Sequence, residues 1–485
     1  MSYPLTAEDL LERLPHYPTS GQEEALRRLA DYLHDDYPNA LFLLRGYAGT
    51  GKTFLLRAIS EAARDSGITV ELLATTGRAA KVLSATCAMP ATTIHRRIYR
   101  PSSASIEEGG SYRLGQAAER TLFIVDEASM IAAEGYEPSP FGSGNLLDDL
   151  LEYVFSGDDA KLILVGDDAQ LPPVGSHESI ALSPQKLHEI YGLRVYSAEL
   201  REVVRQTSES GILEQATYIR QLIEQHQHLS EGMPIPLTLT LGKQADLRVL
   251  RGEDVLDELD SCYRRYGRED VLIVTPSNKR ALQHNLGIRS RIFDYDSELV
   301  RGEQLIVARN NYYYAQRKDR ADFIANGEII ELKRTYQHHY IYGLHFVDAT
   351  IYLPERGMEL EARILVSGLG DEKAQRSHDE RLALYNALAH DYQEGAGTGI
   401  VDTRRAIRRD PYWGALEVKY GYAVTAHKAQ GGQWSCVFVD LGLVGVLPTD
   451  LGMLRWLYTA LTRATERVYL INPPRGLIPA WDENQ

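Results

Sequence analysis

Cysteine is scarce in this chain of 485 residues, which contains only Cys87, Cys262 and Cys436. Three widely spaced cysteines exclude a disulfide framework, and none of them forms a CxxC pair of the kind that binds zinc. We therefore expect free thiols in a reducing compartment. The histidine-containing segments "HQH" (226–228) and "HHY" (338–340) lack partner ligands at metal spacing, so no zinc site is expected there.

Long apolar runs are also missing. The longest, such as "LFLL" (41–44) and "LTLTL" (237–241), are far shorter than the roughly 20 residues that cross a bilayer. The first residues, "MSYPLTAEDLLERL", lack a basic region followed by an apolar run. The sequence therefore predicts no export signal, no membrane contact and a cytoplasmic location.

The chain also lacks an excess of positive charge. The chain has 52 Lys and Arg against 67 Asp and Glu, which gives a net charge of −15 and a pI near 5.5. Such a balance argues against a general polyanion binder. It does not exclude a local basic channel, because nucleic-acid affinity depends on the few charges that meet phosphates.

What the sequence does contain is a regular alternation of short apolar strands and amphipathic helices. Strands that alternate with helices and end in polar residues predict an α/β fold with a parallel sheet, whose site lies at the strand ends. A second α/β pattern later in the chain predicts a second lobe of the same kind. The predicted segments are helices at 19–33, 53–67 and 77–87, strands at 39–46, 69–76, 121–130 and 161–170, and the second pattern at 269–292, 435–442 and 454–473.

Three other stretches differ from this pattern. Residues 301–352 are rich in β-branched and aromatic residues with short turns, which predicts a small β barrel inserted in the second α/β half. Residues 365–412 are charged and partly helical, and their pattern assigns no fold. Residues 99–120 separate two core elements and contain "EEGG", which suits a hairpin tip, although a plain loop fits equally well.

The segment "GYAGTGKT" (46–53) matches a phosphate-binding P-loop and lies between an apolar strand and a helix. Its glycines let backbone amides face phosphate oxygens, and the helix N-terminus favours negative charge. Lys52 is expected to contact the β and γ phosphates, and Thr53 to offer its hydroxyl to Mg²⁺. The predicted ATP-binding residues of this loop are Gly46, Ala48, Gly49, Thr50, Gly51, Lys52 and Thr53.

Two further strand ends complete a predicted hydrolytic site. In "LFIVDEAS", Asp126 is expected to hold Mg²⁺, and Glu127 to orient and deprotonate the attacking water. In "LVGDDAQLPPVG", Gln170 follows a strand expected beside the one that ends at Asp126. An amide there can contact the γ-phosphate or the water without a change of charge. Together these segments predict hydrolysis of ATP with Mg²⁺.

Six segments occur in an order that resembles the motif series of the superfamily 1 (1B) helicases, in the RecD-like and Dda-like branch. They are "GYAGTGKT", "VDEAS", "GDDAQLPPV", "LREVVRQ" (200–206), "YAVTAHKAQGGQW" (422–434) and "YTALTRATERV" (458–468). The resemblance covers roughly residues 15 to 475. It implies two RecA-like P-loop domains with ATP between them, a hairpin or loop insertion in the first and an SH3-like β barrel in the second. The implied division is 1–99 and 121–200 for domain 1A, 100–120 for the pin insertion, 201–300 and 413–485 for domain 2A, and 301–412 for the barrel with its extra charged segment.

The resemblance also assigns residues. It implies that Arg205 and Arg463 reach across the cleft to the γ-phosphate, which a guanidinium suits because it stays charged and binds oxygens in a planar fork. It implies that Gln22 recognises adenine, and that Gln430 and Gly431 couple the ATP cleft to the DNA surface. The residues it implies for DNA contact are Thr76, Thr93 and His95 in the first domain, and Asn278, Thr425, His427 and Lys428 in the second.

The function that the resemblance implies is an ATP-dependent helicase that moves 5′ to 3′ on single-stranded DNA and unwinds duplexes with a 5′ overhang. Single-strand-binding or repair proteins are the expected partners. Three alternatives stay open from the sequence: a superfamily 1 helicase of opposite polarity, an RNA-stimulated ATPase, and a DNA-dependent ATPase that remodels protein–DNA complexes or drives a larger repair complex. No nuclease constellation is visible in the chain, so a nuclease would act in trans.

Overall fold

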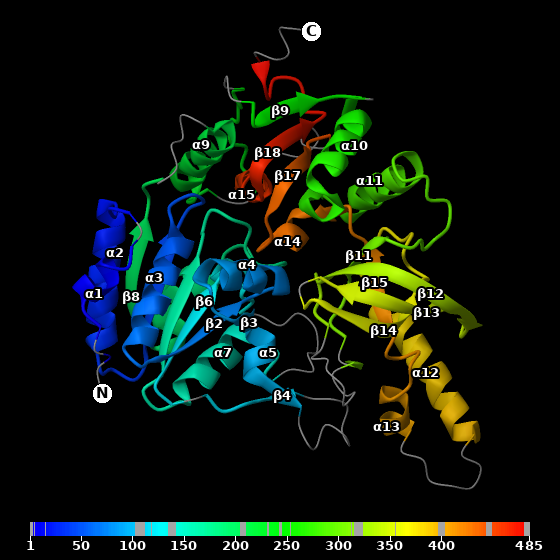
Figure 1. Ribbon diagram of the computed structural model, residues 1–485, viewed down its shortest axis with the longest axis horizontal. Coiled ribbons are helices and arrows are strands. Elements are labelled where there is room, and N and C mark those ends of the chain that lie inside the picture. Colours follow the sequence, from blue (N-terminus) through cyan, green and yellow to red (C-terminus); the bar gives the residue numbers. More distant parts are fainter. Residues whose placement is uncertain are drawn as a thin grey trace.

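Two α/β lobes and a β barrel make up the computed structural model (Figure 1). The structure describes residues 3, 5–14, 16–101, 112–117, 119–133, 142–203, 210–229, 232–241, 245–252, 254–311, 313–314, 324–354, 356–395, 403–442 and 449–479. Among these residues, no helix combines the length and the apolarity needed to cross a bilayer.

The first lobe is built on a six-stranded sheet in the order β3-β2-β6-β7-β1-β8, and every pairing in it is parallel. Alternate residues of β1 point to opposite faces: Phe42 and Leu44 join the core beneath α2 and α3, whereas Leu41 and Leu43 join the core beneath α5 and α7. The strands are β1 (Ala40–Gly46), β2 (Thr69–Ala74), β3 (Ala91–Thr93), β6 (Thr121–Asp126), β7 (Lys161–Gly166) and β8 (Arg194–Leu200). The helices are α1 (Ala7–Leu11), α2 (Ser20–His34), α3 (Lys52–Asp65), α4 (Gly77–Cys87), α5 (Ile94–Ile98), α7 (Leu146–Phe155) and α8 (Pro184–Tyr191), with 3-10 turns η1 (Ala128–Met130) and η2 (Ile180–Leu182).

Strand order explains why the predicted catalytic segments meet. In the sheet, β7 lies between β6 and β1, and all three run parallel. The P-loop follows β1, Asp126 ends β6 and Gln170 follows β7. Because parallel strands have their carboxyl ends at one edge, the three segments lie side by side there.

The second lobe has a five-stranded parallel sheet in the order β16-β10-β17-β18-β9. Its helices α9 and α15 face the first lobe in Figure 1. The strands are β9 (Leu247–Leu250), β10 (Val271–Thr275), β16 (Ala423–Thr425), β17 (Trp434–Asp440) and β18 (Ala464–Ile471). The helices are α9 (Gly211–His226), α10 (Asp254–Tyr266), α11 (Asn278–Arg291), α14 (Ala426–Ala429) and α15 (Leu451–Leu461), with the 3-10 turn η4 (Arg268–Asp270).

A closed five-stranded barrel is inserted between α11 and β16. Its strands are β11 (Gln304–Val307), β12 (Ile329–Ile341), β13 (Leu344–Leu353), β14 (Met358–Leu365) and β15 (Leu416–Tyr420). Between β14 and β15 the chain forms α12 (His378–Gly395) and α13 (Thr403–Arg408), which pack together through Leu384, Leu388 and Ile407. The segment that the sequence left unassigned is therefore largely a helical excursion from the barrel.

The predicted fold class, two RecA-like lobes with a barrel insertion, is confirmed. The exact domain division stays a prediction, and the fifth barrel strand, β15, lies beyond the predicted boundary at residue 412. In the predicted pin region, β4 (Tyr99–Pro101) and β5 (Tyr112–Leu114) pair antiparallel. The "EEGG" tip of that region lies outside the described residues.

A buried ion pair joins the second lobe to the barrel. The Arg289 guanidinium on α11 lies 3.1 Å from the Glu303 carboxylate, which also accepts a 3.0 Å hydrogen bond from the Tyr422 hydroxyl. Arg289 and Glu303 are 5% and 0% exposed. We expect Glu303→Ala to lower the free energy of unfolding by about 3 kcal/mol, because it leaves a buried cation without a countercharge.

Denaturant titration of the purified protein measures this effect. Arg264→Ala is the matched control, because it breaks a pair with Asp260 on the same lobe in which the arginine side chain is 78% exposed. We expect the control to change stability by less than about 0.5 kcal/mol. Equal effects of the two substitutions would contradict a structural role for the buried pair.

Candidate active site

The P-loop adopts the conformation that its glycines allow. Gly49 and Gly51 have φ of 79° and 85°, in the left-handed region, and Gly51 caps the N-terminus of α3. A Cβ on Gly46 would lie 2.9 Å from Thr50 Oγ1, so this position has no room for a larger residue. The Lys52 ammonium donates hydrogen bonds to the carbonyl oxygens of Gly46 and Tyr47. The lysine therefore lies over the loop whose amides are predicted to bind phosphate.

Gln22 is engaged on both sides of its amide. Its Nε2 donates to the Thr50 carbonyl oxygen at 3.0 Å, and its Oε1 accepts from the Thr19 amide at 3.1 Å. The second bond belongs to the capping box that starts α2, in which Thr19 Oγ1 accepts from the Gln22 amide. Gln22 thus holds the P-loop to α2, a role that the sequence did not reveal. Its predicted contact with adenine stays a prediction.

Two carboxylates lie at the end of β6. The Glu127 amide donates to Asp126 Oδ1 at 2.8 Å. The backbone of Glu127 has a φ of 55°, a left-handed conformation that residues other than glycine rarely adopt. Burial, and then the neighbouring Glu127 charge, raise the pKa of Asp126 to about 6. Carboxylates that are costly to charge fit a divalent cation, since Mg²⁺ prefers oxygen ligands. The Thr53 hydroxyl at the start of α3 is a further oxygen donor, and together these groups are of the kind that suits Mg²⁺.

Gln170 follows β7, which pairs with the strand β6 that ends at Asp126. It is 6% exposed, and its Oε1 is buried with no hydrogen-bond partner among the described residues. A buried amide oxygen without a partner is costly in a folded protein. A water molecule or ligand in the cleft would satisfy it.

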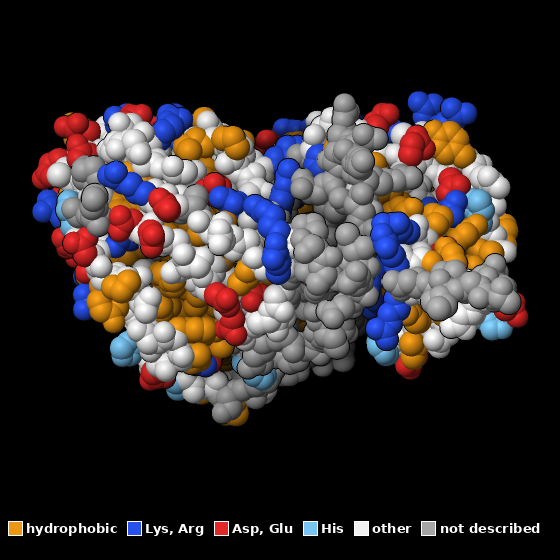
Figure 2. Space-filling view, turned by 90° about the horizontal axis from the view of Figure 1, so that it is seen from below, with side chains coloured by type: hydrophobic (Ala, Val, Ile, Leu, Met, Phe, Trp, Pro, Cys, Tyr) orange, Lys and Arg blue, Asp and Glu red, His pale blue; other side chains and the backbone are white. Residues whose placement is uncertain are grey.

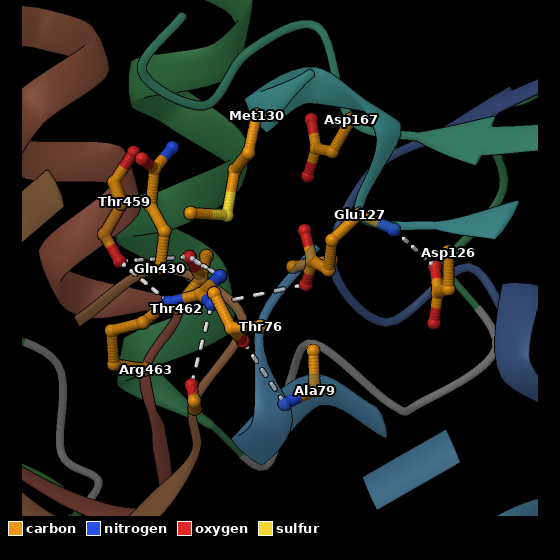
Figure 3. A network of polar contacts seen from close by, with 12 residues as sticks. Thr76, Ala79, Asp126, Glu127, Met130, Asp167, Gln430, Thr459, Thr462 and Arg463 are labelled. Atoms are coloured by element: carbon orange, nitrogen blue, oxygen red, sulfur yellow. Dashed lines mark hydrogen bonds and ion pairs between the residues drawn. The ribbon is translucent and has the colours of Figure 1, made fainter. Parts of the chain in front are cut away.

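Arg463 reaches this cluster from the other lobe. Its Nη1 lies 3.9 Å from Glu127 Oε1, and the arginine side chain is 5% exposed (Figure 3). Its Nε donates to the Thr459 carbonyl oxygen at 3.1 Å, and Nη1 donates to that of Gly432 at 3.3 Å. These bonds hold the guanidinium toward the first lobe. Arg205, the other predicted arginine, lies outside the described residues.

Gln430 and Gly431 also touch the first lobe. Gln430 Nε2 donates to the Leu171 carbonyl oxygen at 2.7 Å. Gly431 has a φ of 70°, and a Cβ there would meet Thr76 Oγ1 at 2.9 Å. This pair therefore lies between the segment after Gln170 and the N-terminus of α4, and its coupling role stays a prediction.

The sequence missed several groups at the lobe interface. Thr459 Oγ1 accepts from the Leu171 amide at 2.9 Å, and the Tyr458 hydroxyl contacts both Ala48 and Asp167. Both residues lie inside "YTALTRA", the segment that supplied Arg463. Position within that segment was the only available signal, because a sequence does not show which hydroxyl crosses an interface.

The predicted DNA-facing residues of the first lobe lie at two helix starts. The hydroxyls of Thr76 and Thr93 accept hydrogen bonds from the amides of Ala79 and Arg96, and so cap α4 and α5. The His95 ring is half-buried, and burial lowers its pKa to about 4. The predicted contacts of these three residues with DNA stay predictions.

In the second lobe, Asn278, Thr425 and Lys428 line one cavity between α11, β16 and the barrel. Lys419 of β15 lines it as well, and this residue was not predicted. Burial, and then the nearby Lys419 charge, lower the pKa of Lys428 to about 8. His427 does not line this cavity, and burial lowers its pKa too.

Comparisons with known proteins agree with this geometry. Residues 18–231 match the family model of an AAA domain, and residues 420–471 match that of a UvrD-like helicase C-terminal domain. The chain is 32% identical over 177 residues to the ATP-dependent RecD2 DNA helicase of Deinococcus radiodurans. The aligned region covers 36% of this chain and 21% of that protein. The chain is also 26% identical over 475 residues to the ATP-dependent DNA helicase dda of Enterobacteria phage T4, and this alignment covers 93% of this chain and 99% of the phage protein.

A solved structure of the Bacteroides Pif1 helicase in complex with ADP-AlF3 and ssDNA aligns with 97% of this chain and 96% of its own, with a TM-score of 0.45 at 13% identity. The fold and the site define a P-loop protein with two RecA-like lobes and a nucleotide site shared between them. The two family models and the two sequence relatives make the chain similar to superfamily 1B helicases of the RecD-like and Dda-like kind.

Proposed function

We propose that this protein is an ATP-dependent DNA helicase that moves 5′ to 3′ along single-stranded DNA and unwinds duplex with a 5′ overhang. One observation carries the proposal: the Arg463 guanidinium of the second lobe lies 3.9 Å from the Glu127 carboxylate of the first. A site completed by two lobes is sensitive to their relative position, so hydrolysis and lobe movement are coupled. The names of the RecD2 and dda relatives support DNA as the substrate.

Each residue of the site has a chemical role in this proposal. Lys52 and the loop amides bind the phosphates, and Glu127 orients the attacking water and accepts its proton. Arg463 stabilises the negative charge that develops on the transferred phosphoryl group. Gln170 senses the γ-phosphate or the water through its free oxygen. Mg²⁺, when held by Thr53 and Asp126, supplies a positive charge next to the phosphate oxygens.

The strand-binding surface is proposed to run over both lobes. The first lobe supplies Thr76, Thr93 and His95, and the second supplies Asn278, Thr425, His427 and Lys428. Figure 2 shows Lys and Arg side chains gathered on both the first-lobe side and the barrel side of the face seen from below. A chain of net charge −15 that concentrates positive charge locally can still bind a phosphate backbone.

A two-part assay tests the proposal. ATP hydrolysis is measured with and without single-stranded DNA or RNA, and unwinding is measured on duplexes that carry a 5′ or a 3′ tail. We expect DNA-stimulated hydrolysis and unwinding from the 5′ tail only. Unwinding only of the duplex with the 3′ tail would contradict the proposed 5′ to 3′ direction and indicate the opposite polarity. Stimulated hydrolysis without unwinding would favour a remodelling ATPase.

The low pKa of Lys428 gives the DNA contact a pH dependence. The Lys428 side chain is mostly charged below about pH 8, and it loses this positive charge progressively as the pH rises through that value. We expect the dissociation constant for a short single strand to rise roughly three- to tenfold between pH 7 and 9 at constant ionic strength. Lys428→Arg should flatten the profile, because a guanidinium stays charged throughout this range. An unchanged profile in that variant would remove Lys428 from the interface.

A further inference from the structure

Tyr458 of α15 makes a contact that no step of the proposed reaction uses. Its side chain is 1% exposed, and its hydroxyl lies between two groups of the opposite lobe. The hydroxyl accepts a 2.9 Å hydrogen bond from the Ala48 amide in the P-loop and donates a 2.8 Å bond to Asp167 Oδ2 after β7. One atom of the second lobe therefore touches both segments that frame the nucleotide site.

A packing role alone does not explain this hydroxyl. Burying a polar group is costly unless it is hydrogen-bonded, and a phenylalanine ring fills nearly the same volume. Both partners of the Tyr458 hydroxyl lie across the interface, whereas a hydroxyl that served only its own lobe would bond there. Asp167 is itself 1% exposed and precedes Gln170 by three positions on the same turn. The contact thus couples the P-loop to the segment that carries Gln170.

The neighbouring loop residue is held to the second lobe in the same way. The Tyr47 hydroxyl donates to the Glu224 carboxylate of α9, and the Arg220 guanidinium of the same helix lies 4.2 Å from the centre of the Tyr47 ring. Two successive P-loop residues, neither of them a glycine or the lysine, are therefore tied to α9 and α15. The loop cannot shift without changing bonds to the second lobe.

We propose that Tyr458 is a positioning residue that transmits the position of the second lobe to the P-loop, and so sets how strongly DNA stimulates hydrolysis. The inference rests on the proposed function. The Tyr458 hydroxyl bonds Ala48 and Asp167, and not Lys52, Thr53 or the P-loop glycines. We therefore expect its loss to affect turnover more than nucleotide binding. DNA bound across both lobes changes their relative position, and this bond carries the change to the loop.

Tyr458→Phe tests the inference by removing one oxygen. ATP hydrolysis by the full chain is measured with and without single-stranded DNA, and binding of fluorescent ADP is titrated separately. We expect DNA-stimulated kcat to fall about tenfold, while KM for ATP and the ADP dissociation constant change less than about threefold. The control is Tyr469→Phe, which removes a hydroxyl that bonds Glu258 and Arg467 within the second lobe. It should retain full stimulation.

Three results would overturn the inference. Tyr458→Phe could keep the wild-type ratio of stimulated to basal kcat, which would leave the hydroxyl without a coupling role. Basal kcat, stimulated kcat and melting temperature could instead fall together, which would indicate a structural role only. If the wild-type protein shows no DNA stimulation, the proposed function fails first, and this outcome is distinguishable because it appears before any variant is compared.

Discussion

Replacing Arg463 with alanine is expected to lower kcat for ATP hydrolysis by about 10³-fold or more, with nucleotide affinity nearly unchanged. The guanidinium is fixed by backbone carbonyl oxygens of its own lobe and lies 3.9 Å from Glu127. It is therefore already oriented toward the site of hydrolysis, and a preorganised charge stabilises a transition state without reorganisation. Steady-state hydrolysis with single-stranded DNA gives kcat, and titration with fluorescent ADP gives the affinity.

The experiment has to distinguish the loss of a catalytic charge from the general effect of removing an arginine from the second lobe. Arg467→Ala is the control, since Arg467 lies on the neighbouring strand β18 and donates to the Tyr469 hydroxyl at 3.1 Å within the second lobe. We expect near wild-type turnover from it. Normal turnover by Arg463→Ala would show that this arginine has no role in hydrolysis. A large loss of ADP affinity would place it in ground-state binding instead.

The parts of the site that the sequence predicted are those whose chemistry lies within one short segment. The P-loop is one example, because eight consecutive residues determine its turn, its helix start and its lysine. The order of strands then brings Asp126 and Gln170 to the same edge, and the apolar strands indicated that Asp126 ends one strand and Gln170 follows another. Parallel pairing of β6, β7 and β1 was the expected consequence of an alternating pattern.

The parts that could not be predicted depend on pairs far apart in the chain. Ala48 and Tyr458 are separated by 410 positions, and nothing local to "YTALTRA" distinguishes a tyrosine that crosses the interface from one that packs within its lobe. Lys419 approaches Lys428 because β15 closes the barrel, and that closure follows a helical excursion with no clear sequence pattern. The apolar residues of α12 are weakly segregated, so their burial against α13 was not visible.

Lys52→Ala is expected to reduce ATP hydrolysis below detection, a loss of at least about 10³-fold in kcat/KM. The Lys52 ammonium is half-buried and donates to two P-loop carbonyl oxygens, Gly46 and Tyr47. Removing it takes away the positive charge for the phosphates and also leaves those carbonyl oxygens without that donor. Both effects act at the same loop, so binding of fluorescent ADP should weaken together with turnover, in contrast to the Arg463 variant.

Two comparisons sharpen this expectation. Lys52→Arg keeps the charge, yet the planar guanidinium is larger than an ammonium and cannot occupy the same place between two carbonyl oxygens, so it too should be inactive. Lys186→Ala, on the surface helix α8 where the lysine pairs with Glu178, should hydrolyse ATP normally. If Lys52→Ala retained DNA-stimulated hydrolysis, the loop would not be the phosphate site. The pairing of Arg463 with Glu127 would then be a structural contact between lobes, and the motor mechanism would lose its source of energy.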